Sequence, residues 1–105
     1  MIELDKKYVF HIPLYKYADE KLVSIEIDDL LDDLIDKLGF ESLYMTKVIS
    51  VYKKRRYDEI LLTVFTSEES PDGIFEKWFR NNNDVLCQEA FAYELAGKMI
   101  VKKLK

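Results

Sequence analysis

The chain has few of the residues on which covalent and metal chemistry usually depend. Its 105 residues include one cysteine, Cys87, and one histidine, His11. A lone cysteine cannot form a disulfide within the chain, which is typical of proteins from a reducing compartment. A structural zinc site needs about four cysteine or histidine ligands, and iron–sulfur clusters need several thiolates. We therefore predict neither a metal site nor a bound cofactor.

Glycine and proline are scarce as well, with three and two residues respectively. Gly39, Gly73 and Gly97 stand far apart, so the phosphate-binding loops that need clustered glycines are absent. No run approaches the roughly 18 consecutive apolar residues of a membrane-spanning helix, and the charged N-terminus lacks the apolar stretch of a secretion signal. These absences favour a cytoplasmic protein of one domain, residues 1–105, with no membrane partner.

The composition that remains is that of a globular protein. Hydrophobic residues make up 49% of the chain and charged residues 34%. The net charge of -4 gives no general attraction to nucleic acid. Half of the 16 Lys and Arg residues, however, lie in two short runs, at 53–56 and 98–105.

Hydrophobic periodicity predicts the elements of the first two thirds. Alternation over residues 8–17 indicates a strand whose end is marked by Pro13, which lacks a donor for a central ladder. The spacing of apolar residues over 27–38 indicates an amphipathic helix, and Gly39 is placed to cap it. Residues 43–52 and 58–66 alternate again, which predicts two strands of a hairpin joined by the charged residues 53–56.

The last third begins with a helix and ends in a segment with two interpretations. Pro71 suits the first position of a helix, and the asparagines at 81–83 end it. Residues 88–95 and 98–104 then form a closing hairpin that turns at 96–97, or residues 85–95 form a helix followed by one strand. The alternation of Phe91 and Tyr93 favours the hairpin. We expect residues 98–105 to approach the basic run at 53–56 only if they form a single fourth strand.

This order of elements predicts an α+β fold. Strand, helix, strand, strand, helix, strand is the βαββαβ plan of a two-layer ferredoxin-like sandwich, here with an extra C-terminal hairpin strand. Two helices then cover one face of an antiparallel sheet and leave the other face open. The plan hosts many unrelated activities, so it does not identify a function.

The open face motivates the main functional hypothesis. Large apolar and aromatic faces rarely stay exposed in a monomer, so we expect this face to bind a partner, either a second copy in a homodimer or another protein. The chain is then a binding or assembly module rather than an enzyme. The tyrosines predicted to line this surface are Tyr15, Tyr17, Tyr44, Tyr52 and Tyr57.

Two alternatives belong to other classes of function. The first is nucleic-acid binding by the basic run between Tyr52 and Tyr57, whose cations could neutralise phosphates; its members are Lys53, Lys54, Arg55 and Arg56. The acidic balance of the whole chain argues against it. The second is a small enzyme that uses His11 together with nearby tyrosines and a carboxylate such as Glu59.

Overall fold

A computed structural model describes residues 3–39, 42–67 and 70–104, without the side chain of Tyr52. It contains seven strands and three helices within these ranges. In chain order they are β1 (Lys6–Pro13), β2 (Tyr15–Ala18), β3 (Lys21–Ser24), α1 (Asp28–Leu38), β4 (Leu43–Tyr52), β5 (Arg55–Thr66), α2 (Pro71–Asn81), α3 (Asn83–Leu86), β6 (Ala90–Leu95) and β7 (Lys98–Lys103).

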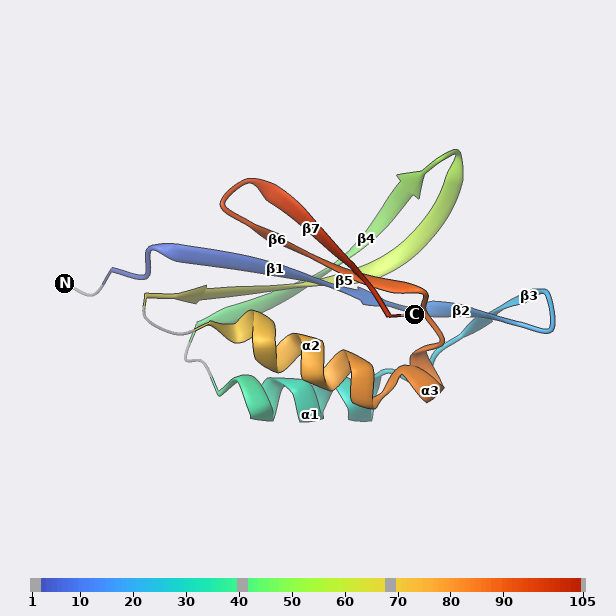
Figure 1. Cartoon of the computed structure of the whole chain (residues 1–105), viewed down its shortest axis with the longest axis horizontal. Coiled ribbons are helices and arrows are strands. Elements are labelled where there is room, and N and C mark those ends of the chain that lie inside the picture. The colour runs from blue at the N-terminus through green and yellow to red at the C-terminus, as the bar shows by residue number, and fades with distance from the viewer. Residues whose placement is uncertain (1–2, 40–41, 68–69, 105) are drawn as a thin grey trace.

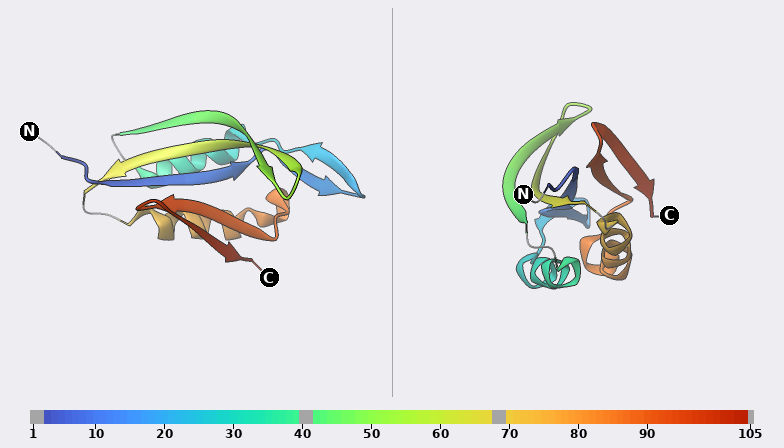
Figure 2. Two further views of the ribbon diagram at one scale, coloured as in Figure 1. Left: turned by 90° about the horizontal axis from the view of Figure 1, so that it is seen from above. Right: turned by 90° about the vertical axis from the view of Figure 1, so that its left-hand side faces the viewer.

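The main layer is a five-stranded antiparallel sheet in the order β4-β5-β1-β6-β7. Helices α1 and α2 lie side by side against one face of this sheet (Figure 1). The two outer hairpins, β4–β5 and β6–β7, rise on the side away from the helices, so the backbone of the sheet is concave on its second face (Figure 2), and this concave side is termed the trough. The α+β class with an antiparallel sheet and a helical layer is therefore confirmed.

The first predicted strand is divided in two. Strand β1 ends at Pro13, and β2 turns out of the main sheet to pair with β3 as a separate two-stranded ribbon. The periodicity of the sequence does not predict β3, because its residues are all exposed and show no buried face. Asp19 and Glu20 form the tight turn of this ribbon with positive φ angles, which suits the twist of a two-residue hairpin.

The charged connection of the β4–β5 hairpin is shorter than expected. Only Lys53 and Lys54 form the turn, both with positive φ, whereas Arg55 and Arg56 are the first residues of β5. The register pairs Tyr52 with Arg55. The basic run is therefore divided between a turn and a strand that points back into the protein.

The C-terminal segment is the closing hairpin, and the alternative of a helix over 85–95 is wrong. Only the short α3 precedes β6, and β7 returns along it. The expected separation of the two basic runs is also wrong: β7 runs in the same direction as β4, so Lys102 and Lys103 lie at the same end of the sheet as the β4–β5 turn, on the opposite edge. Lys105 is outside the described residues.

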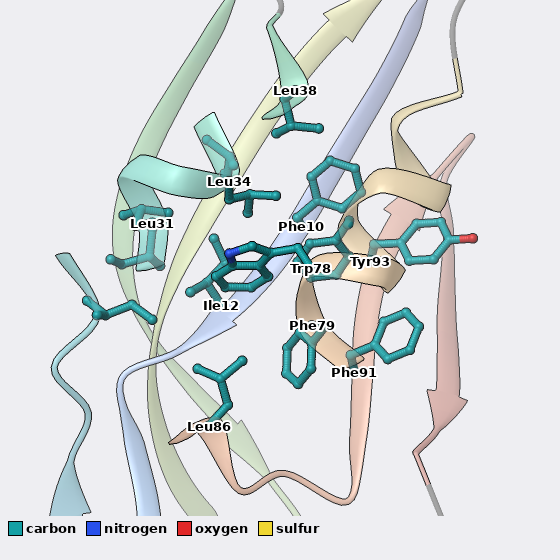
Figure 3. Close-up of a cluster of buried hydrophobic side chains, with 14 of the residues drawn as sticks. Phe10, Ile12, Leu31, Leu34, Leu38, Trp78, Phe79, Leu86, Phe91 and Tyr93 are labelled. Atoms are coloured by element: carbon teal, nitrogen blue, oxygen red, sulfur yellow. The ribbon is translucent and has the colours of Figure 1, made fainter. Parts of the chain in front are cut away.

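The core fills the space between the sheet and the two helices. Phe10 and Ile12 of β1, which are fully buried, meet Leu34 of α1 and the rings of α2 (Figure 3). Phe75 stacks on Phe10 with ring centroids 4.4 Å apart. Trp78 donates a 2.9 Å hydrogen bond from its Nε1 to the Leu30 carbonyl, which links α2 to α1. Gly39 ends α1 in the left-handed conformation, as its position in the sequence predicts.

Truncation of Leu34 tests this packing. Because the side chain is 0% exposed, Leu34→Ala leaves a cavity and should lower the free energy of unfolding by about 2–5 kcal/mol. Asp36→Ala, on the exposed side of the same helix, should change it by less than about 0.5 kcal/mol. Urea unfolding followed by circular dichroism measures both, and equal losses would contradict the assigned core.

Candidate functional site

The trough on the open face contains a hydrogen-bonded cluster of ionisable side chains. His11 Nδ1 lies 3.2 Å from Glu59 Oε2, and His11 Nε2 lies 2.8 Å from Glu94 Oε2. Ser50 donates a 2.6 Å hydrogen bond from its hydroxyl to the same Oε2 of Glu59. The cluster therefore joins β1, β4, β5 and β6 through side chains.

The register of the strands explains why these four residues meet. His11 pairs with Leu61 of β5, and Glu59 is two residues away on the same face of that strand. Val9 pairs with Glu94 of β6, so Glu94 is diagonal to His11 on its other side. All of them face away from the helices because they alternate with the core residues of their strands.

The geometry favours the doubly protonated form of His11, the imidazolium. Each ring nitrogen faces a carboxylate oxygen, and both nitrogens can donate only when the ring is doubly protonated. Burial by itself lowers the pKa of His11, but the hydrogen bonds and charges of Glu59 and Glu94 outweigh it and raise that pKa above its usual value. In the imidazolium form neither nitrogen has a lone pair to accept a proton or bind a metal.

Glu59 is the ionised partner of this cation. Burial raises its pKa, but the hydrogen bonds from His11 and Ser50 outweigh this effect, so the pKa of Glu59 is lowered. Both donors act on Oε2, and no described residue donates a hydrogen bond to Oε1. One oxygen of this carboxylate is thus fixed and the other is available to a ligand.

Glu59 also lines a large open cavity at the end of the sheet where β1 finishes and β5 and β6 begin. The cavity has a volume of about 1130 Å³. Its walls come from the β2–β3 ribbon, the first residues of β5, and α3 with the loop that follows it. The lining residues are Pro13, Tyr15, Lys16, Tyr17, Leu22, Arg55, Arg56, Tyr57, Asp58, Glu59, Asn83, Asp84, Cys87, Gln88, Glu89 and Ala90.

Hydrogen bonds between segments distant in sequence hold the walls of this cavity. Gln88 donates from its amide to the Tyr15 carbonyl at 3.2 Å, and Lys16 donates to the Val85 carbonyl at 3.0 Å. Asn83 and Gln88 exchange two further bonds, which shape the turn after α3. The ribbon is thereby tied to the loop that faces it.

The cavity brings together some of the residues singled out from the sequence and leaves others apart. Those that line it are Tyr15, Tyr17, Tyr57, Arg55 and Arg56. Tyr44 lies elsewhere on β4, beside Phe65. Lys53 and Lys54 are in the exposed turn beyond the cavity. The side chain of Tyr52 lies outside the described structure.

The expected continuous tyrosine surface on the sheet is not what the structure has. Tyr15 and Tyr17 belong to the separate ribbon, and the outer hairpins rise on either side of the open face (Figure 2). Val9 and Thr63, on that face, are only 8% and 4% exposed.

The sequence predicts His11 and Glu59 as candidate site residues, whereas it does not predict Glu94 or the residues after α3. Glu94 alternates with the buried Phe91 and Tyr93, so its face could be inferred once residues 90–95 were taken as a strand. The contact between Glu94 and His11 could not be inferred, because it depends on β6 lying next to β1 in the sheet. Asn83 and Gln88 show no periodic pattern and contribute through a loop.

Comparison with known proteins identifies a related fold. No protein-family model and no curated protein matches the sequence. A solved structure of a phage SAM lyase in its apo state matches with a TM-score of 0.63 and 13% identity, covering 98% of this chain and 94% of that one. A phage SAM lyase in complex with S-methyl-5'-thioadenosine matches with a TM-score of 0.54 and 12% identity, covering 93% and 88%.

These findings contradict the hypothesis of a non-enzymatic binding or assembly module. Both similar chains are lyases, and the face assigned to association carries an ionisable cluster next to a cavity. None of the described helices is long and apolar enough to cross a membrane. Self-association is a prediction that these findings do not address.

The pKa shifts predict how stability depends on pH. The pKa of His11 is raised in the folded state, so its contribution is complete below about 6.5 and is lost as the pH rises through the folded value. The pKa of Glu59 is lowered, so its contribution is complete above about 4.5 and is lost as the pH falls through the folded value. Urea unfolding between pH 5 and 9 should show the alkaline loss in the wild type and lack it in His11→Asn. If the stability of His11→Asn decreased with rising pH as steeply as that of the wild type, the raised pKa of His11 would be contradicted.

Proposed function

We propose that this chain is a lyase that cleaves S-adenosylmethionine (SAM) and releases S-methyl-5'-thioadenosine (MTA). The observation that carries the proposal is the whole-length likeness to two SAM lyase structures, one of them with MTA bound, combined with the cavity beside Glu59. We also propose that β1, α1, β4, β5, α2 and β6 form a ferredoxin-like core. The β2–β3 ribbon and β7 are additions to it, and the ribbon supplies one wall of the cavity.

The cavity has the size and the groups that such a substrate needs. Its volume of about 1130 Å³ exceeds the usual range of small-molecule pockets, so SAM fits with room for water. Tyr15 and Tyr57 offer aromatic rings to the adenine base. The substrate carries one carboxylate and two cationic groups, and the walls carry charges of both signs.

The charged groups of the walls can be assigned by complementarity. Arg55 forms no ion pair with a described residue, so its guanidinium is free to bind the substrate carboxylate in a bidentate manner. Asp84 and Glu89, also without a described ion-pair partner, suit the ammonium group. With His11 doubly protonated and both carboxylates ionised, the cluster of His11, Glu59 and Glu94 has a net charge of -1, which favours the cationic sulfonium near Oε1 of Glu59.

The reaction that fits this site is an internal substitution. A carboxylate oxygen of the substrate attacks its own γ-carbon opposite the sulfur and forms the C–O bond of a lactone. The C–S bond breaks, and its electron pair stays on sulfur, which leaves as the neutral thioether MTA. No proton moves, and the products are MTA and homoserine lactone.

The competing route is elimination, in which a base removes a proton from the β-carbon and an alkene forms. His11 is unsuited to that role because the imidazolium form, which the two carboxylates favour, has no lone pair to accept a proton. Substitution needs no base. The protein contributes by holding the carboxylate near the γ-carbon and by removing water from two opposite charges that disappear in the transition state.

Incubation of the purified chain with SAM tests the proposal. Chromatography should detect MTA in amounts that increase with time and enzyme, and mass spectrometry should detect an equal amount of homoserine lactone. S-adenosylhomocysteine is a matched control because it lacks the sulfonium and should not be cleaved. Formation of the alkene would overturn the substitution mechanism, and absence of MTA would overturn the function.

Arg55 is the residue whose replacement tests substrate recognition. Because a charged hydrogen bond contributes about 1.5–3 kcal/mol, Arg55→Gln should raise KM by about tenfold or more. Lys98→Gln is the matched control, since Lys98 is exposed at the β6–β7 turn away from the cavity. Steady-state kinetics compares them, and equal KM values for both variants would contradict the role of Arg55.

A further inference from the structure

Glu59 is the point at which the polar cluster of the trough meets the cavity. Its side chain is 21% exposed, lines the cavity, and accepts hydrogen bonds on Oε2 from two other strands. Ser50 of β4 donates from one side at 2.6 Å and His11 of β1 from the other at 3.2 Å. Two donors on one oxygen fix the plane of the carboxylate.

We propose that His11, as an imidazolium, is a positioning residue that holds the Glu59 carboxylate so that Oε1 faces the ligand in the cavity. This inference rests on the proposed function. It gives His11 a different task from that of a general base, because the ring never receives a proton from the substrate. Its effect on the ligand passes through Glu59.

The second nitrogen of His11 keeps the ring in this state. Glu94 of β6 lies 2.8 Å from Nε2 and is 42% exposed, so it supplies a negative charge from the solvent side. The charged groups that act on the ring are Glu59 from β5 and Glu94 from β6, and β4 contributes only the Ser50 hydroxyl through Glu59. Glu94 therefore holds the proton on His11 without touching Glu59.

Loss of that proton should release Glu59. A neutral imidazole has one N–H, so the two carboxylates can no longer both receive a hydrogen bond, and a lone pair then faces one of them. The carboxylate loses its fixed orientation. Activity should therefore fall on the alkaline side with the pKa of His11, which the two carboxylates raise.

Two substitutions of His11 separate positioning from general packing. His11→Leu removes the donor and should lower kcat/KM by about tenfold to a hundredfold, with weaker MTA binding in calorimetry. In His11→Asn the amide nitrogen occupies the place of Nδ1 and can donate to Glu59. It should recover most of the lost activity and lose the alkaline decline. Wild-type activity in His11→Leu, or an unchanged decline in His11→Asn, would overturn the proposal.

Glu94→Gln provides a variant that leaves the contact between His11 and Glu59 intact. Removing its charge should move the alkaline decline to lower pH by about one unit. This variant alters a half-exposed side chain, so it tests the proposal even where His11→Leu fails to fold. A pH profile identical to that of the wild type would contradict the role of the imidazolium.

Nuclear magnetic resonance distinguishes failure of this proposal from failure of the function. His11 is the only histidine in the chain, so its ring signals cannot be confused with those of another histidine. We expect two protonated ring nitrogens at pH 7, a pKa that matches the activity profile, and ring shifts on addition of MTA. A wild type that neither binds MTA nor cleaves SAM overturns the function. MTA binding that is equal in the wild type and His11→Leu overturns only the positioning role.

Discussion

The site depends on the antiparallel register of β1 between β5 and β6. This register places His11 diagonally between Glu59 on one neighbour and Glu94 on the other, with both ring nitrogens opposite carboxylate oxygens. Because side chains alternate along a strand, a slip of one residue in either pairing would turn the carboxylate to the helical side. The same alternation places Phe10 and Ile12 in the core. The packing that determines the register thus also determines the ionised cluster.

A charged cluster on a half-buried face carries a cost as well as a gain. Desolvation disfavours each of the three charges, and the hydrogen bonds recover this cost only while all partners are present. Removal of one partner leaves an unpaired charge on a low-dielectric surface. Such a cluster is weak evidence for a purely structural role, because apolar residues could fill the same space. Its position at the rim of a cavity supports a role in binding.

The sequence could predict the elements whose signal is local. The spacing of Leu31, Leu34 and Leu38 and the glycine after them defined α1 and its cap, and alternation defined β4 and most of β5. It predicts residues 15–17 as strand but not β3 or its pairing with β2, because β3 is exposed throughout and shows no alternation of burial. The cavity could not be predicted from the sequence for a different reason. Tyr15, Tyr57 and Gln88 meet only through the sheet order and a loop contact, which no periodicity encodes.

The proposed chemistry is compatible with a likeness at 13% identity, which shows the fold alone. When the substrate supplies both the nucleophile and the leaving group, the protein needs to provide only a cavity, complementary charges and the removal of water. These requirements fix the shape of the site and the balance of its charges rather than particular catalytic side chains. Sequences that fold alike can then diverge widely while they keep the reaction. For the proposed reaction, the residues under the strongest physical constraint are those that orient the binding groups, which is the role proposed for His11 relative to Glu59.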